Sequence, residues 1–197
     1  MSERRTIARR PTQPVPGARV LVLLCHPALH RSRVNRRLAQ AVTDLPGVTL
    51  HDLYEAWPDF DIDVAHEQHL LRSHPHVVFQ HPFYWYSAPA LLKQWMDLVL
   101  ELGWAYGPGG TALRGKTLTS AITTGGPEQA YGPEGYHHHT MDELLTPFST
   151  TAGLCGMHWR PPFVLHGTHR YGEEDLATGA ERYRQAILDL ARAELGP

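Results

Sequence analysis

The chain has 197 residues, 42% of them hydrophobic, and a formal net charge of −2. This length and composition are typical of one ordinary globular domain. The two cysteines, Cys25 and Cys155, cannot form a disulfide framework and lack the CxxC spacing of a zinc or redox motif, so we expect a reducing, cytoplasmic location. No apolar run reaches the roughly 18 residues of a membrane span, and the N-terminus lacks the apolar region of a signal peptide.

Positive charge is concentrated at the N-terminus. Residues 1–19 carry five arginines and one glutamate, whereas the rest of the chain has 13 basic and 19 acidic residues. An acidic body of this kind argues against nucleic acid as a partner. The sequence RRPTQPVPG has three prolines and no hydrophobic periodicity, so we expect residues 1–17 to form a disordered basic leader and residues 18–197 a single domain. The alternative for the leader is a basic arm that contacts a membrane or an acidic partner.

Strand-like and helix-like patterns alternate in the first half of the domain. The continuous apolar run RVLVLLC over 19–25 predicts a strand that is buried on both faces, and helical spacing of apolar residues follows over 34–45. We expect a second strand over 48–54 and then a helix over 63–74 that begins at an aspartate N-cap. A third buried strand is predicted over 76–81.

The second half continues this alternation. A helix is expected to begin near Ala88 or Pro89 and to have one apolar face, formed by Leu91, Leu92, Trp95, Met96 and Val99. A fourth strand over 115–124 precedes a helix over 141–156 that contains Pro147. A fifth strand over 161–167 and a final helix over 173–193 complete the pattern.

Five strands that alternate with five helices predict an α/β fold in which helices cover both faces of an open parallel sheet. We expect a flavodoxin-like five-stranded parallel sheet with strand order 2-1-3-4-5 rather than a six-stranded Rossmann fold, because the strand count stops at five. In such a sheet the ligand cleft lies at the carboxyl ends of the strands, beside the point where the strand order reverses. The loops after strands one, three and four meet there.

The loop after the first strand, CHPALHRSRVN, contains neither GxGxxG nor a P-loop. Ser32 and Asn35 flank the start of the following helix, where a hydroxyl, an amide and backbone N–H groups can surround a phosphate. Arg31 and Arg33 can add positive charge. The alternative is an ordinary serine N-cap beside exposed arginines.

The loop after the fourth strand, TTGGPE, has two consecutive glycines at 125 and 126. Glycines at the end of a strand let the backbone approach a planar ligand, with free N–H groups for its polar edge. A plain turn would have the same sequence.

The loop after the third strand contains four successive aromatic residues, Phe83, Tyr84, Trp85 and Tyr86. Four in succession cannot all face the core, so at least two are expected to line a cleft or a partner surface. Between a phosphate at Ser32 and a ring edge at the two glycines, these residues are in position to wall a planar ring system. Simple packing is the alternative.

Five blocks of sequence carry a resemblance to a known family: HPALHRSRVN, DLYEAWPDFDID, QHPFYWYSAPALLKQWMD, GWAYGPGGTALRGK and ITTGG. In this order and spacing they resemble the NAD(P)H:quinone oxidoreductase family of flavoproteins. The chain is most similar to the short bacterial members of that family, the ancillary proteins of glutathione-regulated potassium-efflux systems. The resemblance covers about residues 19–190 of the sequence.

The resemblance implies a flavodoxin-like homodimer that binds a flavin. FMN is the expected flavin, because this chain stops soon after its last helix, and FAD is the second choice. The ribityl phosphate would lie among His26, Ser32, Arg33, Val34 and Asn35. The backbone that meets the flavin would be that of Phe83, Tyr84, Trp85 and Tyr86. The pyrimidine edge of the flavin would lie on Thr123, Thr124, Gly125 and Gly126. Relatives often have glutamine where this chain has Tyr84, which affects the expected specificity more than the expected cofactor binding.

The reaction that the resemblance implies is a two-electron, ping-pong hydride transfer from NAD(P)H through the flavin to a quinone. Tyr131 and His137 match, in their offsets from Gly126, a tyrosine and a histidine that animal quinone reductases place beside flavin and substrate. The histidine can hold or release the compensating proton. The alternative is a solvated lid. We expect no metal at the triplet 137–139, because adjacent histidines point in divergent directions and lack a ligand partner.

The resemblance also implies partners. Trp104, Tyr106 and Gly107 lie in a segment that is near the subunit interface in dimeric relatives, so we expect a homodimer with both chains completing each active site. One alternative function is that of a regulatory subunit on a potassium-efflux transporter, which would place the protein at the inner face of the cell membrane. A second alternative is azo or nitro reduction, which uses the same hydride.

Overall fold

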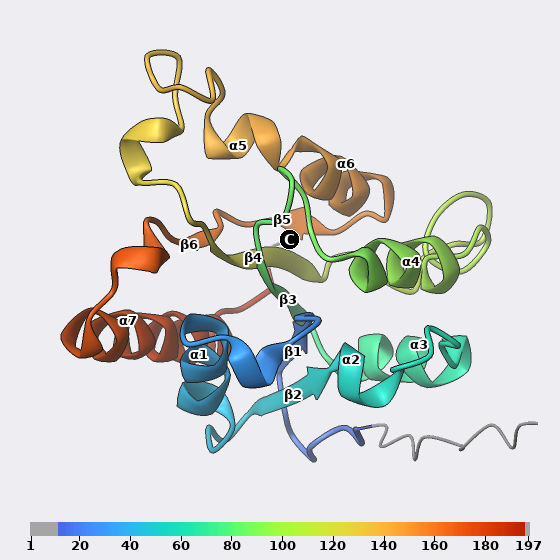
Figure 1. Ribbon diagram of the computed structural model, residues 1–197. Coiled ribbons are helices and arrows are strands. Elements are labelled where there is room, and N and C mark those ends of the chain that lie inside the picture. Colours follow the sequence, from blue (N-terminus) through green and yellow to red (C-terminus); the bar gives the residue numbers. More distant parts are fainter. Residues whose placement is uncertain (1–11, 196–197) are drawn as a thin grey trace, which may run out of the picture.

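A computed structural model describes residues 12–195, and its centre is one parallel sheet (Figure 1). The strands are β1 (Val20–Leu24), β2 (Val48–Asp52), β3 (His76–Pro82), β4 (Thr117–Thr123), β5 (His158–Trp159) and β6 (Phe163–Leu165). Their order is β2-β1-β3-β4-β5, and β6 also pairs with β4, further along that strand than β5 does. Every pairing is parallel, so the predicted flavodoxin-like order is confirmed.

The fifth strand differs from its prediction. In place of the expected strand over 161–167 the structure has the shorter strand β6, and a separate two-residue strand, β5, precedes it. Between the two pieces lie Pro161 and Pro162, which have no N–H group to donate to a sheet ladder. β5 therefore pairs with the start of β4 and β6 with its end.

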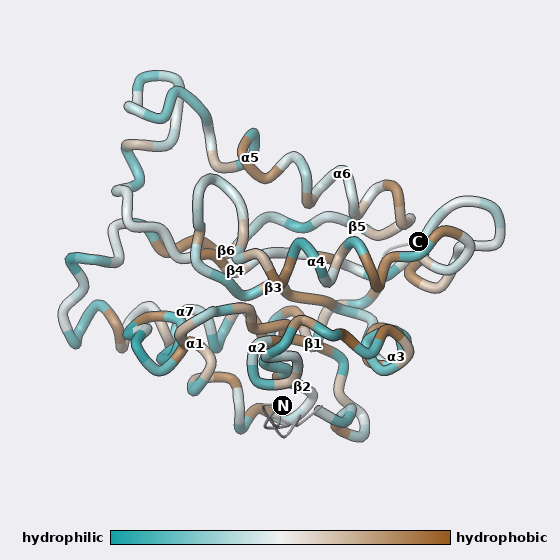
Figure 2. The backbone as a smooth tube through the Cα atoms, turned by 45° about the vertical axis from the view of Figure 1, so that its right-hand side comes forward, coloured by the Kyte–Doolittle hydropathy of each residue, from teal (hydrophilic) through white to brown (hydrophobic). Residues whose placement is uncertain are grey.

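The helices cover both faces of the sheet, as predicted. Along β1, Val20 and Val22 pack toward α1 (Val34–Val42) and α7 (Glu173–Arg192). Leu21 and Leu23 pack on the other face, where they meet α2 (Leu53–Ala56), α3 (Val64–Ser73), α4 (Ala90–Val99) and α6 (Thr146–Leu154). Hydrophobic residues are accordingly dense in the central strands and alternate with hydrophilic ones along the helices (Figure 2). The helix predicted to start near Ala88 or Pro89 begins at Ala90, with Pro89 as its N-cap.

Two local boundaries were predicted wrongly. The expected helix over 141–156 is broken at Leu145 into α5 (Met141–Leu144) and α6, because Pro147 fits only the first turn of a helix. The expected strand over 48–54 ends at Asp52. The Asp52 carboxylate accepts the backbone N–H groups of Tyr54 and Glu55, and this cap starts the short helix α2.

Residues 1–11 of the predicted leader lie outside the described residues. Residues 12–17 are described, and the Val15 amide donates to the Thr49 hydroxyl on β2 at 3.1 Å. Among the described helices, none combines the length and the apolar character that crossing a membrane requires.

Candidate active site

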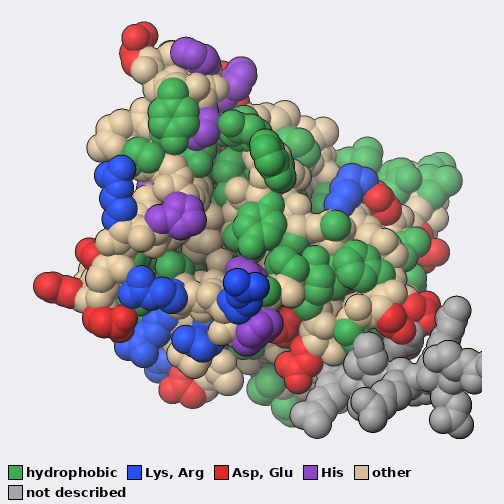
Figure 3. All heavy atoms as spheres, in the orientation of Figure 1, with side chains coloured by type: hydrophobic (Ala, Val, Ile, Leu, Met, Phe, Trp, Pro, Cys, Tyr) green, Lys and Arg blue, Asp and Glu red, His purple; other side chains and the backbone are tan. Residues whose placement is uncertain are grey.

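A groove lies at the carboxyl ends of β1, β3 and β4. Its larger part, of about 410 Å³, is lined by His26, Arg31, Ser32, Arg33, Val34, Asn35, Pro82, Phe83, Tyr84, Thr123, Gly125, Thr168 and His169. A smaller part of about 230 Å³ adjoins it at Phe83 and Gly125 and reaches Trp85, Tyr86, Gly126, Tyr131, Tyr136 and His137. Aromatic and histidine side chains gather on this face above arginines that lie over α1 (Figure 3). The loops chosen from the sequence therefore meet in one groove.

One end of the groove is the start of α1. The Ser32 hydroxyl accepts the Asn35 amide at 3.1 Å. The Arg33 guanidinium turns toward α7, where it donates to the Tyr171 carbonyl at 3.1 Å and to the Glu173 carboxylate at 3.2 Å. Arg31 lines the same end and has no ion-pair partner within residues 12–195. Of the two arginines expected to add positive charge here, Arg33 is therefore paired with Glu173, whereas Arg31 has no acidic partner among the described residues.

Asn35 joins α1 to the sheet at the floor of the groove. Its side-chain amide donates to the Thr123 hydroxyl at 2.8 Å, and its backbone carbonyl accepts from the Gln80 side chain at 3.0 Å. The Asn35 Oδ1 atom is buried and has no partner among the described residues. An acceptor in this state is available to a donor from a ligand in the groove.

His26 borders the same floor. Its Nδ1 accepts the Ala28 amide at 3.1 Å, so the neutral ring carries its hydrogen on Nε2. Burial lowers the pKa of His26 below its usual range, which favours that neutral form.

The four aromatic residues form a tight turn. The Ser87 amide donates to the Tyr84 carbonyl at 3.0 Å, and the two residues between them are both left-handed, with φ of 48° at Trp85 and 60° at Tyr86. Positive φ at both central positions is the pattern that normally selects Asn-Gly. The amides of Trp85 and Tyr86 donate to no acceptor in the part of the chain that the structure describes. Strain of this kind is found at functional sites. Here the strained turn leaves two backbone N–H groups without an acceptor among the described residues.

We expect this strain to be measurable as stability. Trp85 is 92% exposed, so replacing it with asparagine, which tolerates left-handed backbone, loses little packing. The free energy of unfolding in urea should rise by about 1 kcal/mol in Trp85→Asn. The matched control is Tyr136→Asn, which removes an exposed aromatic side chain where φ is negative and should change stability by less than about 0.5 kcal/mol. A destabilised Trp85→Asn would show that the Trp85 side chain, not the turn, sets the local energy.

The other end of the groove is formed by Gly125 and Gly126. A Cβ on Gly125 would overlap the His169 imidazole, and a Cβ on Gly126 would lie 3.0 Å from the Tyr136 hydroxyl and 3.1 Å from that of Tyr131. The backbone N–H groups of both glycines have no acceptor among residues 12–195. Only glycine leaves this surface open to a ligand.

Tyr131 and His137, which the resemblance singled out, lie together here. Their ring centroids are 4.6 Å apart, and the Tyr86 hydroxyl is 3.2 Å from His137 Nδ1. A Cβ on Gly126 would lie 3.3 Å from His137 Nε2. Burial raises the pKa of Tyr131, so its hydroxyl is a hydrogen donor at neutral pH. The aromatic turn and the loop 131–137 thus close over one side of the glycines.

Two groove residues, Thr168 and His169, and the neighbouring His166 were missed in the sequence. A hydrogen bond of 3.2 Å joins His166 Nδ1 to Thr124 Oγ1, and the ring centroids of His166 and Tyr131 are 5.1 Å apart. Burial lowers the pKa of His166. Thr168 and His169 line the groove beside Gly125. All three follow β6, whose carboxyl end lies at the same edge of the sheet, so the loop after the fifth strand was the available signal.

The histidine triplet 137–139 forms no metal-ligand group within the described residues. One such group occurs elsewhere, at His51, His66 and Glu67, whose ligand atoms lie within 4.8 Å of one another. Both oxygens of Glu67 already accept N–H groups, however. Oε1 accepts from His51 at 2.8 Å and from Trp57 at 2.7 Å, and Oε2 accepts from Trp95 at 2.7 Å. We interpret this group as a hydrogen-bond network of the core.

Comparisons with known proteins agree with this fold. A family model described as a Flavodoxin-like fold matches residues 18–189. The glutathione-regulated potassium-efflux system ancillary protein KefG of Pectobacterium carotovorum is 50% identical over 165 residues, which are 84% of this chain and 90% of KefG. These values are far above what a shared fold alone requires.

Three solved structures are also similar. One described as a thermophilic tryptophan halogenase from Streptomycin violaceusniger is 48% identical, with a TM-score of 0.84 over 85% of this chain and 98% of that one. General stress protein 14 of Treponema denticola, in complex with FMN, is 39% identical, with a TM-score of 0.82 over 88% and 99%. An NADPH-quinone reductase from P. pentosaceus is 32% identical, with a TM-score of 0.78 over 85% and 96%. The chain belongs to the flavodoxin-like family, in the group that includes the glutathione-regulated potassium-efflux ancillary proteins and bacterial quinone reductases.

Proposed function

We propose that this protein is an FMN-dependent NAD(P)H:quinone oxidoreductase. The observation that carries the proposal is that Trp85, Tyr86, Gly125 and Gly126 line the same part of the groove, and that their backbone N–H groups have no acceptor among residues 12–195. Backbone donors on two sides of an open, aromatic-walled groove suit the polar edge of a planar heterocycle. The similar Treponema protein was solved with FMN, which supports this choice of ligand.

The residues present fit FMN along the whole groove. Ser32, Arg31 and the start of α1 would hold the phosphate, and the aromatic turn and the glycines would hold the ring system. Bound FMN supplies two-electron hydride chemistry, from NAD(P)H in one half-reaction and to a quinone in the other.

The protein's own contribution is to orient the ligands and to move a proton. With the His137 ring protonated at both nitrogens, Nδ1–H donates to the Tyr86 hydroxyl oxygen, and the Nε2 hydrogen can pass to an oxygen of the reduced quinone, which leaves the ring neutral. The Tyr131 hydroxyl lies beside it and is a second donor. The half-buried loop 131–137 would also keep water from the reacting face.

We expect substitutions at these two donors to slow quinone reduction without loss of FMN. His137→Ala should lower the turnover number about 100-fold and Tyr131→Phe about tenfold, as general acid catalysis is lost. His139→Ala is the matched control, because His139 is exposed and its nearest charged partner is Glu143, at 3.9 Å, outside the groove. Stopped-flow oxidation of the reduced, FMN-loaded variants by a quinone measures the step directly. Unchanged rates in both variants, with FMN fully bound, would contradict the assignment.

The proposal as a whole is tested by reconstitution. The purified protein is mixed with FMN or FAD, freed of excess flavin, and titrated anaerobically with NADH and with NADPH. Retained FMN whose visible absorption bleaches with reduced nicotinamide and returns with a quinone is the expected result. Failure to retain FMN would overturn it. A panel of azo and nitro acceptors in the same assay decides between a quinone and those substrates.

A second candidate function is that of an ancillary subunit on a potassium-efflux transporter. The 50% identity to KefG over nine-tenths of that protein favours it. Such a subunit would be found at the inner face of the cell membrane. Co-purification of the tagged protein with a membrane fraction, lost when the transporter gene is deleted, would support this role, and it is compatible with flavin chemistry.

We also propose that the protein is a homodimer. Trp104 and Tyr106 pack on the core while Gly107 and Leu102 beside them are exposed, which leaves a small apolar surface for a second chain. Sedimentation at micromolar concentration should give twice the mass of one chain. A monomer would exclude active sites that two chains complete.

A further inference from the structure

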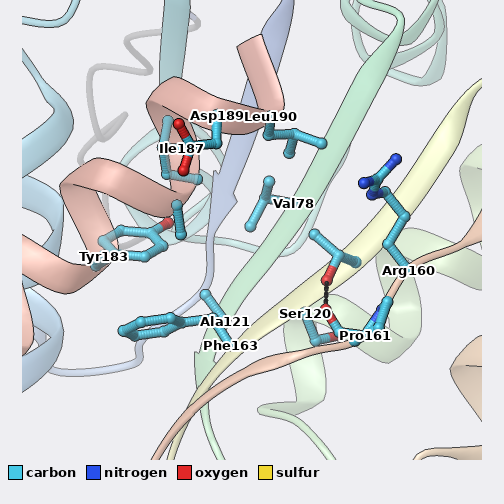
Figure 4. Close-up of a pocket in the computed structure, with 12 residues that line it drawn as sticks. Val78, Ser120, Ala121, Arg160, Pro161, Phe163, Tyr183, Ile187, Asp189 and Leu190 are labelled. Atoms are coloured by element: carbon cyan, nitrogen blue, oxygen red, sulfur yellow. Dashed lines mark hydrogen bonds between the residues drawn. The ribbon is translucent and has the colours of Figure 1, made fainter. Parts of the chain in front are cut away.

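A second hollow, of about 250 Å³, lies on the α1 and α7 face of the sheet (Figure 4). It is found where the chain leaves the sheet between β5 and β6, beneath the last turns of α7. Pro161 forms part of its wall, and its carbonyl accepts the Thr119 hydroxyl at 3.0 Å. The hollow shares no lining residue with the groove described above.

The walls of this hollow are mostly apolar. Val78 and Ala121 come from the sheet, Phe163 from β6, and Tyr183, Ile187 and Leu190 from α7. Figure 4 shows these side chains around a common space.

Positive charge borders the hollow. The Arg160 guanidinium stands at one side and has no ion-pair or hydrogen-bond partner among residues 12–195. Asp189 lies opposite, but its carboxylate already accepts Gln185 at 2.8 Å and faces Arg192 at 3.7 Å. Burial lowers the pKa of neighbouring His76, and the nearby charges of Arg19, Arg160 and Lys116 lower it further. The free charge at this end of the molecule is therefore positive.

A buried chain of hydrogen bonds joins this hollow to the groove. The Tyr183 hydroxyl, in the wall of the hollow, donates to Gln80 Oε1 at 3.1 Å. Gln80 Nε2 donates to the Asn35 carbonyl at 3.0 Å, and Asn35 Nδ2 donates to Thr123 Oγ1 at 2.8 Å. Asn35 and Thr123 line the groove. All four residues are buried, so the geometry of one end constrains that of the other.

We propose that the hollow binds a small organic monocarboxylate with an apolar body, and that this binding strengthens the binding of FMN in the groove. The carboxylate lies on Arg160 and the apolar body lies against Phe163 and Ile187. A ligand packed on Tyr183 fixes α7 and, through Gln80, the position of Asn35 at the groove floor. The effect on FMN rests on the proposed function, whereas the binding of the carboxylate does not.

Binding is tested first, on the protein without flavin, with 4-phenylbutyrate as the probe and ligand-observed NMR as the readout. Arg160→Gln should weaken binding at least fivefold, and the neutral 4-phenylbutyramide should bind correspondingly less well. Ala186 is exposed on α7 at the hollow, so Ala186→Trp should fill it and abolish binding. Ala177→Trp, on the same helix and outside the hollow, should have no effect. No binding to the wild-type protein, or binding that none of these changes alters, would overturn the proposal.

Coupling is tested next, by titrating FMN with and without the probe. Saturating 4-phenylbutyrate should tighten FMN binding at least about fivefold, the lower end of typical allosteric couplings. By linkage, FMN should tighten probe binding by the same factor, a check that needs no variant. Tyr183→Phe keeps the hollow but lacks the hydroxyl. In this variant the probe should still bind, but the FMN affinity should be the same with and without the probe. Equal FMN affinity with and without bound probe in the wild-type protein would overturn the coupling and leave the FMN assignment untouched.

Discussion

Gly125→Val is expected to weaken FMN binding more than about 100-fold while the protein stays folded, a loss of about 2.7 kcal/mol. The backbone at Gly125 has negative φ, so a side chain is permitted there. The new methyl groups would instead enter the groove, where even a Cβ overlaps His169. The substitution therefore removes space for the ring system and shields the free amide behind it.

Fluorescence quenching of FMN measures this effect, and Gly132→Val is the matched control. Gly132 also has negative φ and lies in a loop, but a Cβ there meets no atom within 4 Å. The control should bind FMN with the affinity of the unaltered chain. If Gly125→Val binds FMN normally, the heterocycle does not lie against the two glycines and the orientation proposed for it is wrong.

Strand order and the covering of both sheet faces could be predicted because their signals are local and repeated. RVLVLLC is apolar without interruption, and in the structure Val20 and Leu21 pack into different cores on opposite faces. Such a strand can lie only in the middle of a two-sided sheet. The cleft followed from the same reasoning, since the carboxyl ends of parallel strands meet at one edge.

The parts that were missed depend on contacts distant in sequence. Nothing near Arg33 shows that Glu173, 140 residues away, would form an ion pair with its guanidinium. His166 and His169 were overlooked because the loop after the fifth strand was not considered, although its strand was predicted. The left-handed turn at Trp85 and Tyr86 contradicts their local preferences, which is typical of a site where function is favoured over stability.

The core beneath α3 provides the second large expected effect. Glu67 is fully buried, and its carboxylate accepts N–H groups from His51, Trp57 and Trp95. Burial by itself would raise the pKa of Glu67, but the hydrogen bonds and the neighbouring His51 outweigh it and hold the pKa below its usual range. The ionised carboxylate is therefore the form that the native structure stabilises.

Glu67→Gln should destabilise the protein by about 3–5 kcal/mol at pH 7, the usual cost of breaking a buried charged network. The amide nitrogen of glutamine must face one of the three donors, which leaves a buried N–H group without an acceptor. The pH dependence has a defined sign. A depressed native pKa contributes stability that is present above the unfolded value of about 4.3 and is lost as the pH falls through the native pKa.

Urea unfolding from pH 7 down to pH 3 therefore distinguishes Glu67→Gln from a variant that is merely less well packed. The difference in free energy of unfolding between the two proteins should be constant above about pH 5 and should shrink below the unfolded pKa of about 4.3. Glu181→Gln on the exposed side of α7 removes the same charge without a buried contact, and it should change stability by less than about 0.5 kcal/mol. If the native pKa were instead raised by burial, the wild-type protein would gain stability relative to Glu67→Gln as the pH falls from 7 toward about 4.3, and that result would contradict a carboxylate held ionised by its three donors.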